Sequence, residues 1–137
     1  MQLILDTNII ISALLKDGVT RAMLLSPGLE YLLPEFALEE IQKHLPLLIE
    51  KSGLKESSIK LLLSLMLEQI KIVPSDKIIP FIPEADKIIG NIDKNDVPFI
   101  ALALSRNNDG IWTNDTHFDK QTKIKIWKTQ DLIHNIF

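Results

Sequence analysis

Short apolar runs alternate with amphipathic stretches along the chain, an order typical of strands that alternate with helices. The runs predict five buried strands, over residues 2–5, 31–33, 70–73, 111–113 and 125–127. Apolar positions at helical spacing predict helices over 9–15, 20–25, 55–68, 84–89 and 97–105, a helix from 35 that kinks or ends near Pro46, and a last helix from Thr129. This order predicts the α/β class, with a mostly parallel sheet covered by helices on both faces.

Length and composition limit the classes of protein to consider. The chain has 137 residues, of which 46% are hydrophobic, so we expect a single domain over residues 1–137. Because there is no cysteine, disulfide frameworks, thiolate metal sites and thiol nucleophiles are excluded. No apolar run approaches the roughly 20 residues that cross a bilayer, and Met1 is followed by apolar residues and an acid rather than by a basic leader. We therefore expect a cytoplasmic protein without a membrane partner.

The net charge of −3 says little about partners, but the charge is unevenly distributed. Residues 120–131 contain four lysines and one acid, Asp131. This segment can dock a polyanion or can be an ordinary solvated surface, and the pattern leaves both interpretations open.

Two aspartates come at the ends of predicted strands. Asp6 comes after the run 2–5, and Asp115 comes after the run 111–113. In a parallel sheet both carboxylates lie at the edge where α/β folds bind their ligands. Each residue alone is explained equally well as a turn or capping aspartate, so the prediction of a site depends on the pair.

A third acid lies at the start of a predicted helix. Asp96 precedes Ile100 and Ala103 by four and seven residues, a spacing that directs its carboxylate to the buried face. Asp93 is more simply explained as the cap of the same helix. The alternative for Asp96 is an acid that only complements the helix N-terminus, which does not require an inward position.

The helix after residue 34 carries two adjacent acids with different predicted environments. At about 100° per residue, Glu40 lies at the edge of the apolar stripe centred on Ile41, whereas Glu39 faces water. Glu40 can therefore reach the edge of the sheet, or it can be an ordinary boundary residue of an amphipathic helix.

The convergence of these acids would require a compensating charge. Two carboxylates about 4 Å apart repel by about 4 kcal/mol at an effective dielectric constant of about 20, so protons or a cation must offset the repulsion. Oxygen ligands without cysteine favour Mg²⁺ or Mn²⁺ over Zn²⁺. Asp119 is a further predicted ligand if 116–119 forms a helical turn. None of the three histidines shows ligand spacing, although His117 lies close enough to Asp115 to support a ligand.

These motifs together resemble the PIN-domain family, which includes the VapC-type toxins of prokaryotic toxin–antitoxin pairs. The motifs are Asp6-Thr7-Asn8, Glu40 within Leu38-Glu39-Glu40-Ile41, the stretch 93–104 and the stretch 111–119. The resemblance implies a three-layer α/β/α sandwich and a metal-dependent endoribonuclease. It also implies a catalytic set of Asp6, Glu40, Asp96 and Asp115, with Asp119 as an additional metal ligand. An antitoxin partner and a homodimer are expected for such a protein.

The chemistry that suits such a site is hydrolysis of RNA phosphodiester bonds, with one or two metal ions activating water for in-line attack. Phosphate contacts are expected from Lys94, Lys120 and Lys123. Two alternatives belong to other classes of protein. One is a PIN-like scaffold that binds RNA or protein without cleavage. The other is a receiver-like phospho-acceptor domain, although Thr7 follows Asp6 where such domains favour a second acid.

Overall fold

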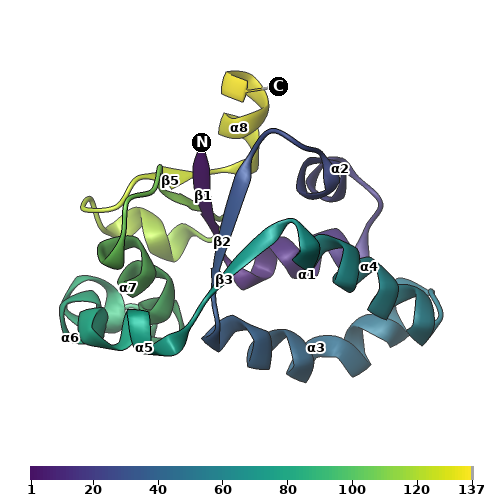
Figure 1. Ribbon diagram of the computed structural model, residues 1–137, viewed down its shortest axis with the longest axis horizontal. Helices are drawn as coiled ribbons and strands as arrows, with labels where there is room; N and C mark the ends of the chain where they lie inside the picture. Colours follow the sequence, from purple (N-terminus) through teal and green to yellow (C-terminus); the bar gives the residue numbers. More distant parts are fainter. Residues whose placement is uncertain (137) are drawn as a thin grey trace.

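Five parallel strands form the centre of the molecule, in the order β3-β2-β1-β4-β5 (Figure 1). The computed structural model describes residues 1–136, except the side chain of Ile136. The strands are β1 (Gln2–Leu5), β2 (Glu30–Pro34), β3 (Ile70–Val73), β4 (Ile111–Trp112) and β5 (Ile126–Trp127). The register pairs Ile4 with Leu32 on one side and with Ile111 on the other. The predicted parallel sheet is confirmed, and each predicted strand is present within two residues of its expected bounds.

Helices cover both faces of this sheet. The helices are α1 (Thr7–Leu15), α2 (Val19–Leu25), α3 (Phe36–Ser52), α4 (Glu56–Glu68), α5 (Ser75–Ile78), α6 (Ile82–Ala85), α7 (Val97–Ser105) and α8 (Thr129–Ile136). Helices α1 to α4 lie on one side of the sheet and α5 to α7 on the other (Figure 1). Because both faces are covered, β1 has an apolar run rather than an alternating pattern, and Leu3, Ile4 and Leu5 are all fully buried. The three-layer α/β/α class is therefore confirmed.

Of the kink or end expected for the helix near Pro46, the end is wrong. Helix α3 continues through Pro46 to Ser52 and ends at Gly53. Proline costs the helix one backbone hydrogen bond, but Leu45 and Leu48 on either side of it are buried in the core. Burial of this stripe holds the helix together across the proline.

The segment between β3 and α7 is more helical than its prolines suggest. The sequence predicts only one short helix there, over 84–89. The structure has helical turns at Ile79–Phe81 (η1) and Asp86–Gly90 (η2) in addition to α5 and α6. Pro80 and Pro83 each lie in the first turn of a segment, where a missing amide costs little. Each proline therefore starts a new short helix instead of interrupting one.

None of the helices within residues 1–136 is both long enough and apolar enough to cross a bilayer.

Gly110 is required where β4 meets β5. Its φ of 125° is a conformation that other residues rarely adopt, and a Cβ there would collide with the backbone carbonyl oxygen of Lys125. That oxygen accepts the backbone hydrogen bond of Ile111, at 2.9 Å. We expect Gly110→Ala to lower the free energy of unfolding by at least about 2 kcal/mol, measured by urea denaturation.

Gly28→Ala is the matched control for this prediction. Gly28 has a similar φ of 118°, but a Cβ there would meet no described atom within 4 Å. The control therefore measures backbone strain alone and should lose less stability. Equal losses in the two variants would contradict a steric role for Gly110.

Candidate functional site

An acidic pocket of about 120 Å³ lies beyond the carboxyl ends of β1 and β4. It is lined by side chains from four separate parts of the chain: Asp6, Thr7, Asn8, Glu40, His44, Asp93, Asn95, Asp96, Phe99 and Asp115. The four acids expected to form the catalytic set are all among these residues. Residues more than 100 positions apart in the sequence therefore share one cavity.

Asp6 is held in place by a neighbouring strand. It is 4% exposed and occupies the N-cap position of α1, with an extended backbone. Its Oδ2 accepts a hydrogen bond of 2.8 Å from Thr113 Oγ1. The same Thr113 oxygen accepts a hydrogen bond of 3.0 Å from the backbone amide of Asp115. Thr113 thus connects the ends of β1 and β4 and fixes two of the acids relative to each other.

Burial dominates the electrostatics of Asp6. Loss of water contact raises the pKa of its carboxyl, and the hydrogen bond from Thr113 opposes this effect. The charges of Asp115 and Glu40 raise the pKa further. The pocket therefore disfavours the charged form of Asp6 unless a positive charge is present.

Asp96 has the most perturbed carboxyl in the pocket. It is 6% exposed and lies between the helical turn Lys94–Asp96 (η3) and α7. Burial and the charges of Asp93, Asp6 and Asp115 together raise the pKa of Asp96 to about 7, against a lowering effect of His117. Among residues 1–136, its Oδ2 has no hydrogen-bond partner. The predicted inward direction of this side chain is thus observed.

The helical phase of α3 also places Glu39 and Glu40 as expected. Glu40 is partly buried and lines the acidic pocket, whereas Glu39 is exposed and borders only an adjoining cavity. Ala37 and Ile41 on the same helix are buried against the core. Burial of this stripe fixes the direction of Glu40.

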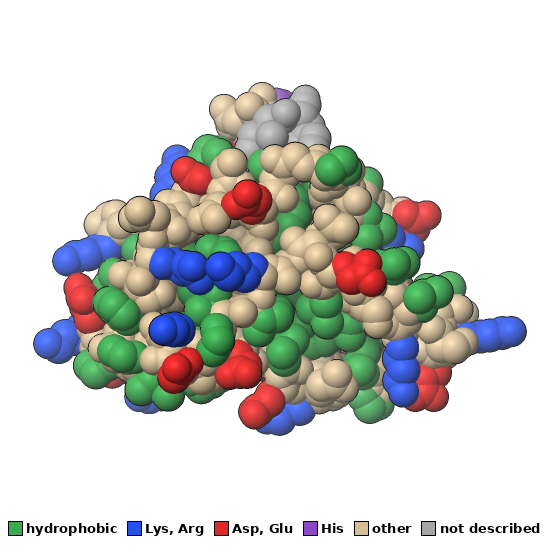
Figure 2. All heavy atoms as spheres, viewed as in Figure 1, with side chains coloured by type: hydrophobic (Ala, Val, Ile, Leu, Met, Phe, Trp, Pro, Cys, Tyr) green, Lys and Arg blue, Asp and Glu red, His purple; other side chains and the backbone are tan. Residues whose placement is uncertain are grey.

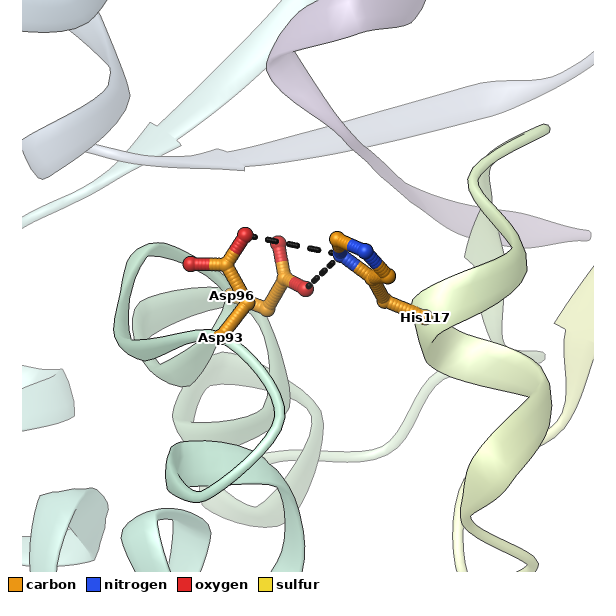
Figure 3. A group of neighbouring side chains, drawn as sticks. All are labelled: Asp93, Asp96 and His117. Carbon is orange, nitrogen blue, oxygen red and sulfur yellow. Dashed lines mark ion pairs between the residues drawn. The ribbon is translucent and has the colours of Figure 1, made fainter.

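Asp93 and Asp115 border the pocket from two short helical turns. Asp93 Oδ1 accepts the amide of Asn95 at 2.9 Å, which confirms Asp93 as a capping residue. Asp115 Oδ1 accepts the amide of His117 at 2.9 Å and so begins the turn Thr116–Lys120 (η4). The turn carries the ring of His117 toward Asp93 and Asp96 (Figure 3).

The other residues predicted for the site include Asp119, Lys94 and Lys120, and none of these three lines the acidic pocket. Asp119 does not line the pocket, and its Oδ2 forms an ion pair of 3.1 Å with Lys128 Nζ. Lys94 lies beside the pocket, in the adjoining cavity that also contains Lys43. Lys120 is exposed at the end of η4.

The expectation that Lys123 contacts phosphates beside the acids requires a correction. It lines a different cavity together with Gly110, which precedes β4. The amino ends of parallel strands lie opposite the carboxyl ends, so Lys123 is on the wrong edge of the sheet for phosphate contacts near the acids. The loop after η4 returns to the start of β5 and takes Lys123 with it.

Several residues in or beside the acidic pocket were not expected from the sequence. Thr113 could have been identified as a polar residue at a strand end, two positions before Asp115. Lys43 lies one turn after Glu40 on α3 and adds a positive charge to the adjoining cavity. Thr7 Oγ1 is buried without a hydrogen-bond partner in the described part of the chain, and no sequence signal distinguishes it from an ordinary helix-capping hydroxyl.

The potential metal ligands in this pocket suit a divalent cation. They are mainly carboxylate, amide and hydroxyl oxygens, which are the ligands of Mg²⁺ and Mn²⁺. Within residues 1–136, no Lys or Arg side chain forms an ion pair with any of the acids that line the pocket. Asp96 Oδ2 and Thr7 Oγ1 are buried without a hydrogen-bond partner in residues 1–136, so both oxygens are free to bind such a cation.

Comparisons with known proteins agree with the sequence motifs. A family model described as "PIN domain" matches residues 4–135. A similar fold occurs in the crystal structure of VapBC2 from Rickettsia felis bound to a DNA fragment from their promoter, with a TM-score of 0.71. The similarity covers 93% of this chain and 98% of that chain at 20% sequence identity, which supports the fold alone. A comparison with curated proteins gives no significant match.

Proposed function

Because the chain belongs to the PIN-domain family, we propose that it is a Mg²⁺- or Mn²⁺-dependent endoribonuclease. The main support is the convergence of Asp6, Glu40, Asp96 and Asp115, from four segments, on one pocket whose charge no Lys or Arg of residues 1–136 offsets by an ion pair. Structural ion-pair networks also perturb carboxyl groups, but they usually contain Lys or Arg, whereas in residues 1–136 the basic side chain that pairs with these acids is His117, at 3.4 to 3.7 Å.

The four acids would hold the metal, with Asp6 and Asp96 as its most buried ligands. A divalent ion bound there would lower the pKa of a water molecule and stabilise the charge that develops on the leaving oxygen. The role of Thr113 is to hold Asp6 and Asp115 in fixed positions through its two hydrogen bonds. The proton that Asp96 retains near neutral pH in the metal-free protein would be lost when the metal binds. Asp119 remains a proposed additional ligand that would have to leave Lys128.

The experiment that tests this function incubates the protein with a mixed pool of RNA in the presence of Mn²⁺, Mg²⁺ or a chelator. We expect cleavage only with metal, and products with 5′-phosphate and 3′-hydroxyl ends. Binding of RNA without cleavage under all three conditions would instead support the scaffold alternative.

Contacts to RNA would have to come from local positive charges. The face shown in Figure 2 mixes acidic, basic and apolar side chains, in keeping with the net charge of −3. We propose that Lys94 and Lys43, which line the cavity next to the acids, contact phosphates, and that Lys120 extends this path.

Charge reversal of these lysines should weaken RNA binding. We expect Lys43→Glu and Lys94→Glu each to reduce the slope of log affinity against log salt by about 1, because each removes one phosphate contact. Filter binding at several salt concentrations measures this slope. Lys123→Glu, on the opposite edge of the sheet, is the control and should leave the slope unaltered. The assignment fails if Lys123→Glu has the larger effect.

The VapBC2 structure also suggests a biological context. That structure contains VapBC2 bound to a DNA fragment from their promoter. We propose that this chain is likewise the toxin of a toxin–antitoxin pair, that it acts on cytoplasmic RNA, and that it forms a homodimer. Expression of the chain alone should then arrest growth, and co-expression with a protein encoded beside it should restore growth.

A further inference from the structure

A basic cavity lies at the β3 edge of the sheet, apart from the acidic pocket. Its volume is about 530 Å³, and its lining comes from β3, α5, η1 and the C-terminal end of α7: Lys71, Val73, Pro74, Lys77, Phe81, Ser105 and Arg106. None of these residues lines the acidic pocket. The lining contains three basic side chains and no acidic one, although acids outnumber basic residues by 18 to 15 in the whole chain.

The three basic residues of this cavity come from separate elements. Lys71 lies on β3, Lys77 on α5, and Arg106 directly after α7, and all three are exposed. Within residues 1–136, none of them forms an ion pair with an acid. Figure 2 shows Lys and Arg side chains left of centre, over the region where Figure 1 places β3 and α7. Like charges around one cavity repel one another, so a bound anion would stabilise this arrangement.

The position of β3 leaves the cavity accessible. Strand β3 is at the edge of the sheet and pairs with β2. A lysine on such a strand can simply prevent pairing with another chain, which would explain Lys71 but not Lys77 or Arg106, since neither of these lies on a strand. The frame of the cavity is fixed, because Ser75 N and Oγ donate hydrogen bonds of 3.0 and 2.9 Å to Glu35 Oε1 and hold the start of α5 to the end of β2.

An aromatic side chain forms part of the cavity wall. Phe81 is partly buried and packs against the core, so its ring is held in place while one part of it lines the cavity. Ser105 adds no donor, because its hydroxyl already donates to the backbone oxygen of Leu102 at 2.7 Å. The cavity therefore offers positive charges beside an aromatic surface. Proteins bind nucleotides with this combination, in which cations contact phosphate and an aromatic ring stacks on the base.

From these features we propose that the cavity binds a nucleotide, with its phosphate among Lys71, Lys77 and Arg106 and its base against Phe81. A guanidinium matches phosphate with two parallel hydrogen bonds, and lysines add point charges. The volume lies within the range of about 300 to 1,000 Å³ that is usual for small-molecule sites. The nucleotide is either free or the end of an RNA strand, since both present the same groups. Binding here depends neither on the proposed nuclease activity nor on a metal ion.

The test is calorimetric titration of the intact protein with ADP, adenosine, inorganic phosphate or a short oligoribonucleotide, at low salt and in chelator. The chelator removes metal-dependent binding at the acidic pocket. Arg106→Gln and Lys77→Gln each remove one positive charge, and Phe81→Leu removes the ring but keeps an apolar side chain. Lys87→Gln is the matched control, because Lys87 is exposed on η2 and does not line the cavity. Circular dichroism of each variant verifies the fold.

We expect ADP to bind more tightly than adenosine or inorganic phosphate. Arg106→Gln and Lys77→Gln should each weaken ADP binding by roughly 10-fold or more, because each removes a charge-assisted hydrogen bond. Phe81→Leu should weaken the binding of ADP but not that of inorganic phosphate, and Lys87→Gln should bind as the wild type does. An oligoribonucleotide that binds more tightly than ADP, with the same losses in the variants, would identify the ligand as an RNA end. Weaker binding of the oligoribonucleotide would identify it as a free nucleotide.

Three results would overturn this proposal. Neither ADP nor the oligoribonucleotide binding at millimolar concentrations would mean that the basic residues are only a solvated surface. Inorganic phosphate binding as tightly as ADP would mean that the cavity does not recognise a base. Equal losses in Arg106→Gln and Lys87→Gln would mean that overall charge, rather than the cavity, attracts the ligand. The variant Asp96→Asn separates this proposal from the proposed function, because it should lose cleavage and retain ADP binding.

Discussion

Replacing Asp96 by Asn should reduce metal-dependent RNA cleavage by at least about 100-fold without unfolding the protein. Asp96 is buried at the start of α7, and the charges of Asp6 and Asp115 both raise the pKa of its carboxyl. Asn has the same shape but supplies a weaker, neutral ligand. The same loss is expected for Asp6→Asn. Initial rates of cleavage with saturating Mn²⁺ measure the effect, and circular dichroism verifies the fold.

Glu39→Gln and Glu40→Gln provide a matched pair of controls on α3. Glu40 lines the acidic pocket, whereas its neighbour Glu39 is exposed. We expect cleavage to be strongly reduced in Glu40→Gln and unchanged in Glu39→Gln. An inactive Glu39→Gln together with an active Glu40→Gln would contradict the assignment of α3 to the site.

The metal-free protein should be less stable at pH 8 than at pH 5, by about 3 kcal/mol. The pKa of Asp96 is raised from 3.8 to about 7 in the folded protein, mainly by burial. A raised pKa means that the folded state holds a proton that the unfolded state releases. This contribution is fully present below about pH 4 and is lost as the pH rises to about 7. The pKa of Asp6 is raised too, so its effect has the same sign.

Urea denaturation in chelator at the two pH values measures this difference. Asp96→Asn should be more stable than the wild type at pH 8, and its stability should vary much less between the two pH values. Saturating Mg²⁺ should also stabilise the wild type at pH 8, because the ion offsets the same charges. Wild-type stability that stays constant or increases between pH 5 and pH 8 would contradict the buried, mutually repelling acids.

The sequence predicted the parts of the site that depend on periodicity. Asp6 and Asp115 follow buried strands, and parallel pairing brings such residues to one edge of a sheet. Asp96 and Glu40 follow from helical phase, because the apolar stripe of each helix determines which neighbouring positions face inward. For these residues, the hydrophobic pattern of each strand or helix and the parallel pairing of the strands determine where the side chain lies.

Features that depend on loop paths could not be predicted in the same way. Lys123 is close to Asp115 in sequence, but the chain between them crosses from one edge of the sheet to the other. His117 shows no ligand spacing, since its carboxylate neighbours Asp93 and Asp96 come from a turn more than 20 residues earlier. Pro46 remained helical because burial of the stripe on both sides of it outweighs one lost hydrogen bond.

The most direct test is a crystal structure of the protein grown with Mn²⁺ and measured at a wavelength where manganese scatters anomalously. We expect an anomalous peak in contact with the carboxylates of Asp6, Asp96 and Asp115. Full occupancy of Mn²⁺ elsewhere, with no peak beside Asp6, would contradict the proposal that these converging acids form a metal-dependent active site.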